Sequence, residues 1–144
     1  MVTSIEVGRP AEEVFAYATD PTRFVEWQQG VVGGHMDSGD GRGPAVGDVC
    51  VTIRRIGGAE RPATSRLVAL EPPRAWAVRG IDGPIRAAVD VTVEPLAATG
   101  SRLTIAVDFE DHGIGKILVP LMVRREARKE MPGNLANLKI RLES

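Results

Sequence analysis

The residues whose types and spacing best suit ligand binding are basic side chains near the C-terminal end of the chain. Residues 124–130 carry an Arg/Lys cluster interleaved with Glu126 and Glu130, a pattern typical of a solvated helix surface with pairs of opposite charge. Arg128 differs from its neighbours, because its angular position on a helix falls within the apolar arcs on both sides of Pro132. Its stem should therefore run along the apolar side. The guanidinium could then extend to water at the rim of the cavity, or it could bind the carboxylate or phenolate of a ligand.

The two histidines and the single cysteine are the remaining candidates for proton transfer or nucleophilic chemistry. His112 falls at the predicted turn into the last helix, where a polar cap explains it. His35 falls on a predicted strand at 31–36 with an ambiguous face, so a place in a binding site stays open. Cys50 alternates with valines and is expected to point away from the apolar face. No histidine or cysteine spacing matches a metal-ligand set.

Glycine-rich stretches and tryptophans could in principle mark cofactor or ligand sites. The glycines at 33–34, 39–43 and 57–58 are interpreted as turn residues. None lies between a strand and a long helix with the spacing of a phosphate-binding loop. We therefore expect no cofactor and no metal. Trp76, if it points inward, would form a flat wall for a ring-shaped ligand. Core packing is the favoured interpretation for both Trp76 and Trp27.

The composition limits the classes of protein that the chain can belong to. Its 144 residues suit one domain over 1–144, with 43% apolar and 26% charged residues. A net charge of −1 argues against a general nucleic-acid binder. One cysteine, no signal-peptide pattern and no long apolar run predict a cytoplasmic protein without a membrane span. The preference for Arg over Lys suggests a high-GC bacterial genome.

The order of predicted elements is a strand, two short helices, about six strands and one long helix. A strand at 3–7 precedes a helix that begins at Pro10, whose missing N–H costs nothing in a first turn, and that stops before Pro21. A second short helix covers 22–27. Alternation of apolar and polar residues then predicts an antiparallel meander with one apolar face. Its strands lie at 31–36, 49–54, 65–70, 75–79, 85–93 and 103–109.

The apolar face of this sheet needs a cover, and the only long element left is a helix at 114–142. Pro132 and Gly133 interrupt its pattern, and the apolar stripe rotates across them. We therefore expect two helical segments with a joint near 131–133. The odd-numbered residues of strands 85–93 and 103–109 should face this helix.

Several short motifs, in this order, carry a resemblance to a known superfamily. The chain resembles the SRPBCC superfamily, also called START-like or birch-pollen-allergen-like, and within it the bacterial polyketide cyclase/dehydrase and lipid-transport group. The match runs over almost the whole chain. The residues that carry it are Pro10-Ala11-Glu12-Glu13-Val14-Phe15, Asp20-Pro21, Trp27, Val46-Gly47, Leu70-Glu71-Pro72-Pro73-Arg74, Leu135, Leu138-Lys139 and Leu142-Glu143.

The resemblance implies an α+β helix-grip fold, in which a bent antiparallel sheet of about seven strands surrounds the C-terminal helix and leaves a ligand cavity. The superfamily shares no catalytic residues, so none is carried over. Residues expected to line the cavity share an inward position on the sheet or the helix, or a polar or flat side chain suited to a ligand. They are Arg128, His35, Trp76, Leu121, Val89, Val91, Ile105 and Val107.

Three classes of function remain open at this point. The leading expectation is a carrier or sensor that binds a small hydrophobic molecule such as a lipid or polyketide. An aromatic polyketide cyclase or dehydratase would use the same pocket, although few inward acids or bases are apparent. A domain that only binds other proteins would fill the pocket with its own side chains. The sequence predicts no nucleic-acid partner and leaves a homodimer open.

Overall fold

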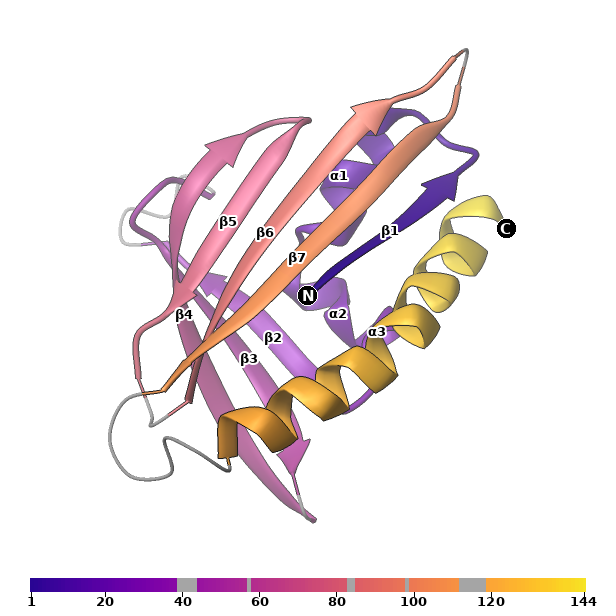
Figure 1. Ribbon diagram of the computed structural model, residues 1–144. Coiled ribbons are helices and arrows are strands. Elements are labelled where there is room, and N and C mark those ends of the chain that lie inside the picture. Colours follow the sequence, from indigo (N-terminus) through magenta and orange to yellow (C-terminus); the bar gives the residue numbers. More distant parts are fainter. Residues whose placement is uncertain (39–43, 57, 83–84, 98, 112–118) are drawn as a thin grey trace.

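The computed structural model describes residues 1–38, 44–56, 58–82, 85–97, 99–111 and 119–144 (Figure 1). The helical elements are α1 (Ala11–Ala18), a 3-10 turn η1 (Pro21–Arg23), α2 (Phe24–Trp27) and the long α3 (Val119–Glu143). The strands are β1 (Val2–Val7), β2 (Val31–Asp37), β3 (Val49–Ile56), β4 (Ala59–Glu71), β5 (Ala75–Gly80), β6 (Ile85–Pro95) and β7 (Ser101–Asp111).

The seven strands form one antiparallel sheet in the order β1-β7-β6-β5-β4-β3-β2. Strands β2 to β7 therefore form a meander, and β1 joins it at the β7 edge. Figure 1 shows the sheet curving around its inner face, with α1 and α2 at one end and α3 running across the open side. The predicted helix-grip architecture is confirmed.

The first helices form where proline and aspartate allow the chain to turn. Pro10 occupies the N-cap of α1, and the acidic residues of its first turn oppose the positive end of the helix dipole. The single helix predicted at 22–27 is two elements, because the side chain of Asp20 accepts a 3.0 Å hydrogen bond from the N–H of Thr22 and starts a separate 3-10 turn.

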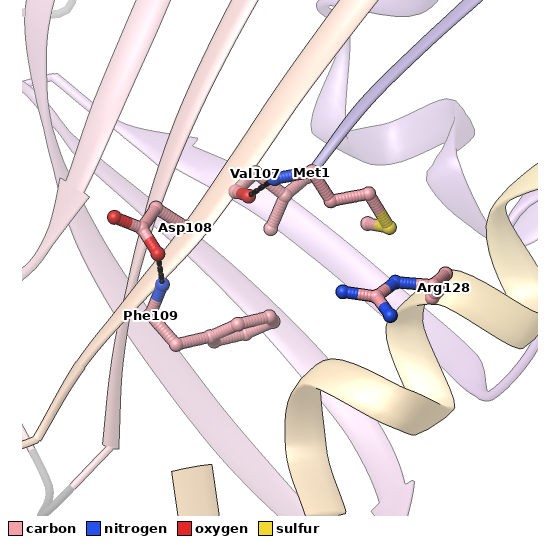
Figure 2. Close-up of a pocket in the computed structure, with 5 residues that line it drawn as sticks. All are labelled: Met1, Val107, Asp108, Phe109 and Arg128. Atoms are coloured by element: carbon pink, nitrogen blue, oxygen red, sulfur yellow. Dashed lines mark hydrogen bonds between the residues drawn. The ribbon is translucent and has the colours of Figure 1, made fainter. Parts of the chain in front are cut away.

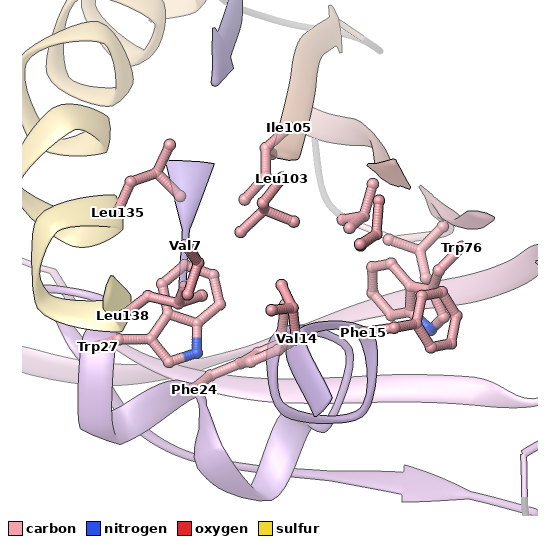
Figure 3. Close-up of a cluster of buried hydrophobic side chains, with 14 of the residues drawn as sticks. Val7, Val14, Phe15, Phe24, Trp27, Trp76, Leu103, Ile105, Leu135 and Leu138 are labelled. Atoms are coloured by element: carbon pink, nitrogen blue, oxygen red, sulfur yellow. The ribbon is translucent and has the colours of Figure 1, made fainter. Parts of the chain in front are cut away.

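The hydrophobic core lies between the inner face of the sheet, α1, α2 and the C-terminal half of α3 (Figure 3). The predicted register of β6 and β7 is confirmed, since the odd residues at 91–93 and 103–107 are buried while Thr92, Glu94 and Asp108 are exposed. Leu135 and Leu138 bring α3 onto this core. The buried odd residues are Val91, Val93, Leu103, Ile105 and Val107.

Helix α3 runs without interruption through Pro132, so the predicted division into two segments is wrong. Figure 1 shows its axis curving along the sheet rather than running straight. A proline removes one backbone hydrogen bond and pushes aside the carbonyl of the preceding turn, which bends a helix without breaking it when both flanks are held. The predicted helix start at 114–118 and His112 lie outside the described residues. No helix in the described part of the chain is long and apolar enough to cross a membrane.

The orientation of β3 also differs from the expectation. Cys50 is buried, at 4% exposure, and points inward together with Thr52. Cys50 pairs with Met36 on β2 and with Ser65 on β4, so these residues share the inner face. An alternating pattern identifies two faces of a strand, but pairing with its neighbours decides which face is buried.

Hydrogen bonds anchor the C-terminal half of α3 to the rest of the fold. The buried Asn134 accepts a 2.9 Å hydrogen bond at Oδ1 from the backbone N–H of Gln29, after α2. Lys139 donates to the carbonyl of Glu6 at 2.7 Å, and Arg9 donates to the carbonyl of Leu142 at 2.7 Å. Farther toward the N-terminus of α3, the side chains of Arg125, Arg128 and Lys129 are exposed.

Candidate functional site

The apolar inner face of the sheet continues beyond the packed core. Val91 and Ile105, which are paired across β6 and β7, are buried beneath the helices. One step along the same strands, Val89 faces Val107 and is only partly buried. The next inward residue of β7, Phe109, is again partly buried. Burial of the inner face therefore decreases toward the region under the N-terminal half of α3.

Arg128 borders a pocket between the sheet and α3. Figure 2 shows its guanidinium projecting from α3 toward Met1 and the Phe109 ring, with Val107 and Asp108 completing the lining. The volume of this pocket is about 30 Å³, enough for water molecules but not for a larger guest. Arg128 thus lies on the side of α3 that faces the sheet, at an exposed rim.

A second guanidinium, that of Arg54 on β3, lies on the same inward side of the strand as Cys50 and Thr52. Its Nη2 lies 3.5 Å from Oε1 of Gln28, the residue that follows α2. Burial lowers the pKa of the Arg54 guanidinium, and attraction to Glu130 on α3 partly offsets that effect. Arg54 therefore places a positive charge between sheet and helix in surroundings poor in water.

Arg54 was missed by sequence reasoning, and the reason is specific. The valines at 49 and 51 suggested that the odd residues of β3 face the core, so the even residues were assigned to solvent. The alternation of Cys50, Thr52 and Arg54 contained the signal, since a strand with one polar face toward a ligand space also alternates.

Cys50 lies on this inner face, but its thiol is poorly suited to nucleophilic chemistry. Burial raises the pKa of Cys50 to about 11, and the nearby charge of Arg54 only partly opposes this shift. The thiolate is the reactive form, so almost all of this cysteine is unreactive at neutral pH.

The structure brings together some of the residues predicted to line a cavity and separates others. Val89, Val91, Ile105 and Val107 lie on the inner face. Trp76 also points inward and belongs to the core. Its ring packs edge-on against the Phe24 ring, with 6.4 Å between the two ring centroids.

Two further predicted lining residues lie elsewhere. The side chain of His35 is on the outer face, because its neighbour Met36 takes the inward position. It is 54% exposed, and its Nε2 lies 3.4 Å from Oδ1 of Asp37. Leu121 belongs to α3, but its side chain is outside the described part. Among the described residues, no cluster of His, Cys, Asp or Glu could hold a metal ion.

A bent antiparallel sheet closed by a C-terminal helix, with an apolar inner face that carries isolated polar groups, defines the helix-grip class of proteins. The chain belongs to the polyketide cyclase/dehydrase and lipid transport family, whose model matches residues 1–143. The resemblance drawn from the sequence motifs is thereby confirmed. A comparison with curated protein sequences finds no significant match.

Solved structures with the same fold have low sequence identity to this chain. A START superfamily protein from Mycobacterium smegmatis is 17% identical with a TM-score of 0.78, over 99% of this chain and 96% of that one. The Zhui aromatase/cyclase from Streptomyces sp. R1128 is 16% identical with a TM-score of 0.81, over 99% and 92%. The di-domain aromatase/cyclase BexL of the BE-7585A pathway is 18% identical with a TM-score of 0.75, over 99% and 46%.

Proposed function

We propose that this protein binds a small apolar molecule with one acidic group on the inner face of its sheet, beneath the N-terminal half of α3. One observation carries this proposal, namely that the partly buried Arg54 lies on the inward side of β3, on a face otherwise lined by partly buried apolar side chains. Ligand sites commonly combine apolar walls with a few polar groups that fix orientation.

The chemistry of Arg54 favours a carboxylate or phenolate as the acidic group. A guanidinium stays charged even when burial disfavours its charge, and it can donate two parallel hydrogen bonds to a carboxylate. Apolar contacts would come from Val89, Phe109 and Met36, which are all partly buried on the inner face. Methionine adapts its shape readily, which suits a site that accepts related ligands.

The space between sheet and helix must widen when such a ligand binds. The pocket beside Arg128, at about 30 Å³, is far smaller than a typical ligand site. The hydrogen bonds of Asn134, Lys139 and Leu142 hold the C-terminal half of α3. Pro132 lies between the two halves of α3, and the helix turn that lacks its N–H donor can bend so that the N-terminal half moves outward while the anchored half stays in place.

A matched pair of ligands tests the proposal. Decanoate and decanol have the same alkyl chain and differ in charge, and displacement of the neutral fluorescent probe N-phenyl-1-naphthylamine measures the binding of each. We expect Arg54→Gln to weaken decanoate binding by about tenfold or more, because a hydrogen bond to a charged group contributes about 1.5–3 kcal/mol. Decanol binding should change much less, since its hydroxyl has no negative charge and cannot accept two parallel hydrogen bonds from the guanidinium.

Arg55→Gln is the control, because Arg55 is the next residue of β3 and is exposed and paired with Glu60 at 3.5 Å. It should leave both ligands unaffected. If neither ligand displaces the probe from the wild type, the binding function is wrong. Equal losses for decanoate and decanol in Arg54→Gln would remove only the role given to Arg54.

A cyclase of poly-β-ketone chains is the second candidate function, and the position of Arg54 is what favours it. A guanidinium in a water-poor site could polarise a carbonyl and stabilise the enolate oxygen that forms during an aldol closure. The Zhui and BexL relatives, described as aromatase/cyclases, share this fold. Co-expression with a minimal polyketide synthase separates the two functions, because a cyclase changes the ring pattern of the product and a carrier does not.

A further inference from the structure

Two adjacent cross-strand pairs of charged residues lie near the tip of the β3–β4 hairpin. Arg55 is opposite Glu60, and Arg54 is opposite Arg61. The side chains of directly opposite residues in an antiparallel pair share one face of the sheet. Arg55 and Glu60 therefore lie on the outer face, whereas Arg61 lies with Arg54 on the inner face.

The alternation along β4 gives the same orientation for Arg61. Ser65 is opposite the buried Cys50 and so belongs to the inner face. Ala63 and Arg61 share that face, because they take alternate positions in a ladder without a register shift. Arg54 is partly buried and Arg61 is exposed. The hairpin projects at one end of the sheet (Figure 1), so the two arginines lie where the inner face opens to water.

Charge is matched on the outer face of this hairpin but not on its inner face. Nη2 of Arg55 lies 3.5 Å from Oε2 of Glu60. Within the part of the chain that the structure describes, no carboxylate forms an ion pair with Arg61. Like charges that are directly opposite destabilise a sheet, and the attraction of Glu130 on α3 offsets only part of this excess at Arg54. The inner face at this end therefore has an excess of positive charge that favours an anion.

We propose that Arg54 and Arg61 together bind a doubly charged head group, the phosphate monoester of an apolar molecule. The proposal rests on the binding function proposed above and names its acidic group. Directly opposite residues have Cβ atoms about 4.5–5.5 Å apart, so two long side chains can reach the oxygens of one phosphate. Each guanidinium presents a fork of donors that fits phosphate oxygens. Glu130 lies on the half of α3 that moves outward, so two guanidinium charges then face the two charges of the ligand.

Two alkyl phosphates that differ by one charge test this proposal. Decyl phosphate and decyl methyl phosphate have the same alkyl chain and the same phosphate centre. At pH 8 the monoester is doubly charged, because its second ionisation lies near pH 6, whereas the diester has one charge. Displacement of N-phenyl-1-naphthylamine measures both affinities, in a buffer without phosphate and below the critical micelle concentrations.

We expect the wild type to bind decyl phosphate about fivefold more tightly than decyl methyl phosphate, which is the most that one exposed ion pair usually contributes. Arg61→Gln should remove this preference and change decyl methyl phosphate binding much less. Arg55→Gln removes a neighbouring exposed arginine from the outer face and should keep the preference. An equal concentration of inorganic phosphate should not reduce the binding of decyl phosphate, since the free anion has no apolar chain.

The proposal is overturned if the wild type shows no preference for decyl phosphate, if Arg61→Gln keeps the preference, or if Arg55→Gln loses it equally. Strong competition by inorganic phosphate would assign the site to the free anion and would also overturn it. Decanoate has one charge, so its binding decides the binding function separately. If decanoate binds and decyl phosphate is not preferred, only the doubly charged head group is wrong. If none of these amphiphiles binds, both proposals are wrong.

Discussion

Glu143, in the last turn of α3, accepts a 2.7 Å hydrogen bond at Oε2 from the backbone N–H of Gly8, directly after β1. The same oxygen accepts a 3.0 Å hydrogen bond from Nζ of Lys139. This contact ties the end of the long helix to the first strand.

The carboxylate of Glu143 should make stability depend on pH. The Gly8 hydrogen bond and then Lys139 lower the pKa of Glu143 in the folded state. A lowered folded pKa gives stabilisation that is present above the unfolded value of about 4.3 and is lost as pH falls through the folded pKa. We expect Glu143→Gln to lower the urea midpoint at pH 7 and to match the wild type at pH 3. Glu71→Gln is the control, because Glu71 is exposed and its Oε1 lies 3.8 Å from Nη2 of Arg74. A loss in Glu143→Gln that persists at pH 3 would contradict the charged contact.

Gly34 on β2 should tolerate no side chain. A Cβ at this position would lie 2.6 Å from the carbonyl oxygen of Pro21 and 3.1 Å from that of Val51. Because both contacts are backbone atoms, we expect Gly34→Ala to lower the free energy of unfolding by about 1–3 kcal/mol. Gly33→Ala is a matched control, since its Cβ would meet nothing within 4 Å. Urea unfolding compares the two, and equal effects would refute the close approach of β2 to η1.

Pro132 should limit the stability of α3. Replacing it with Ala restores a backbone donor inside the helix, so we expect Pro132→Ala to raise the free energy of unfolding by up to about 3 kcal/mol. Gly133→Ala is a useful comparison, because its Cβ also meets open space and the expected gain is about 1 kcal/mol. If Pro132→Ala is destabilising, the bend contributes to packing and is not merely tolerated.

Sequence patterns predicted the parts of the fold in which one face of an element is consistently apolar. In β6 and β7, Val91 and Ile105 alternate with polar residues, and the register followed directly. In β3 the more apolar set, Val49, Val51 and Ile53, lies on the less buried face, so the pattern predicted the wrong side. Pairing of Cys50 with Met36 decides which side is inward, and that pairing follows a register shift between Val31 and Gly33 that no local pattern indicates.

The candidate site was predictable only in part for the same reason. Arg128 was identified because its helical angle is a local property of the sequence. Arg54 required the orientation of β3 and the position of Glu130 across the fold, and both depend on contacts between distant segments. The sequence of the strand that contains His35 does not indicate which face is inward. In the structure the His35 side chain lies on the outer face, so it does not line the site.

The position of β1 beside β7 has a consequence for how the chain acquires its structure. About 100 residues separate β1 from its partners, Ser101 to Ala106, so these partners are synthesised later than β1. At 5–20 residues per second, that delay is about 5–20 s. Ile5 and Val7 therefore remain without their sheet neighbours until β7 has been synthesised. Closing so long a stretch of chain is entropically costly, so docking of β1 should be a late and slow event in folding.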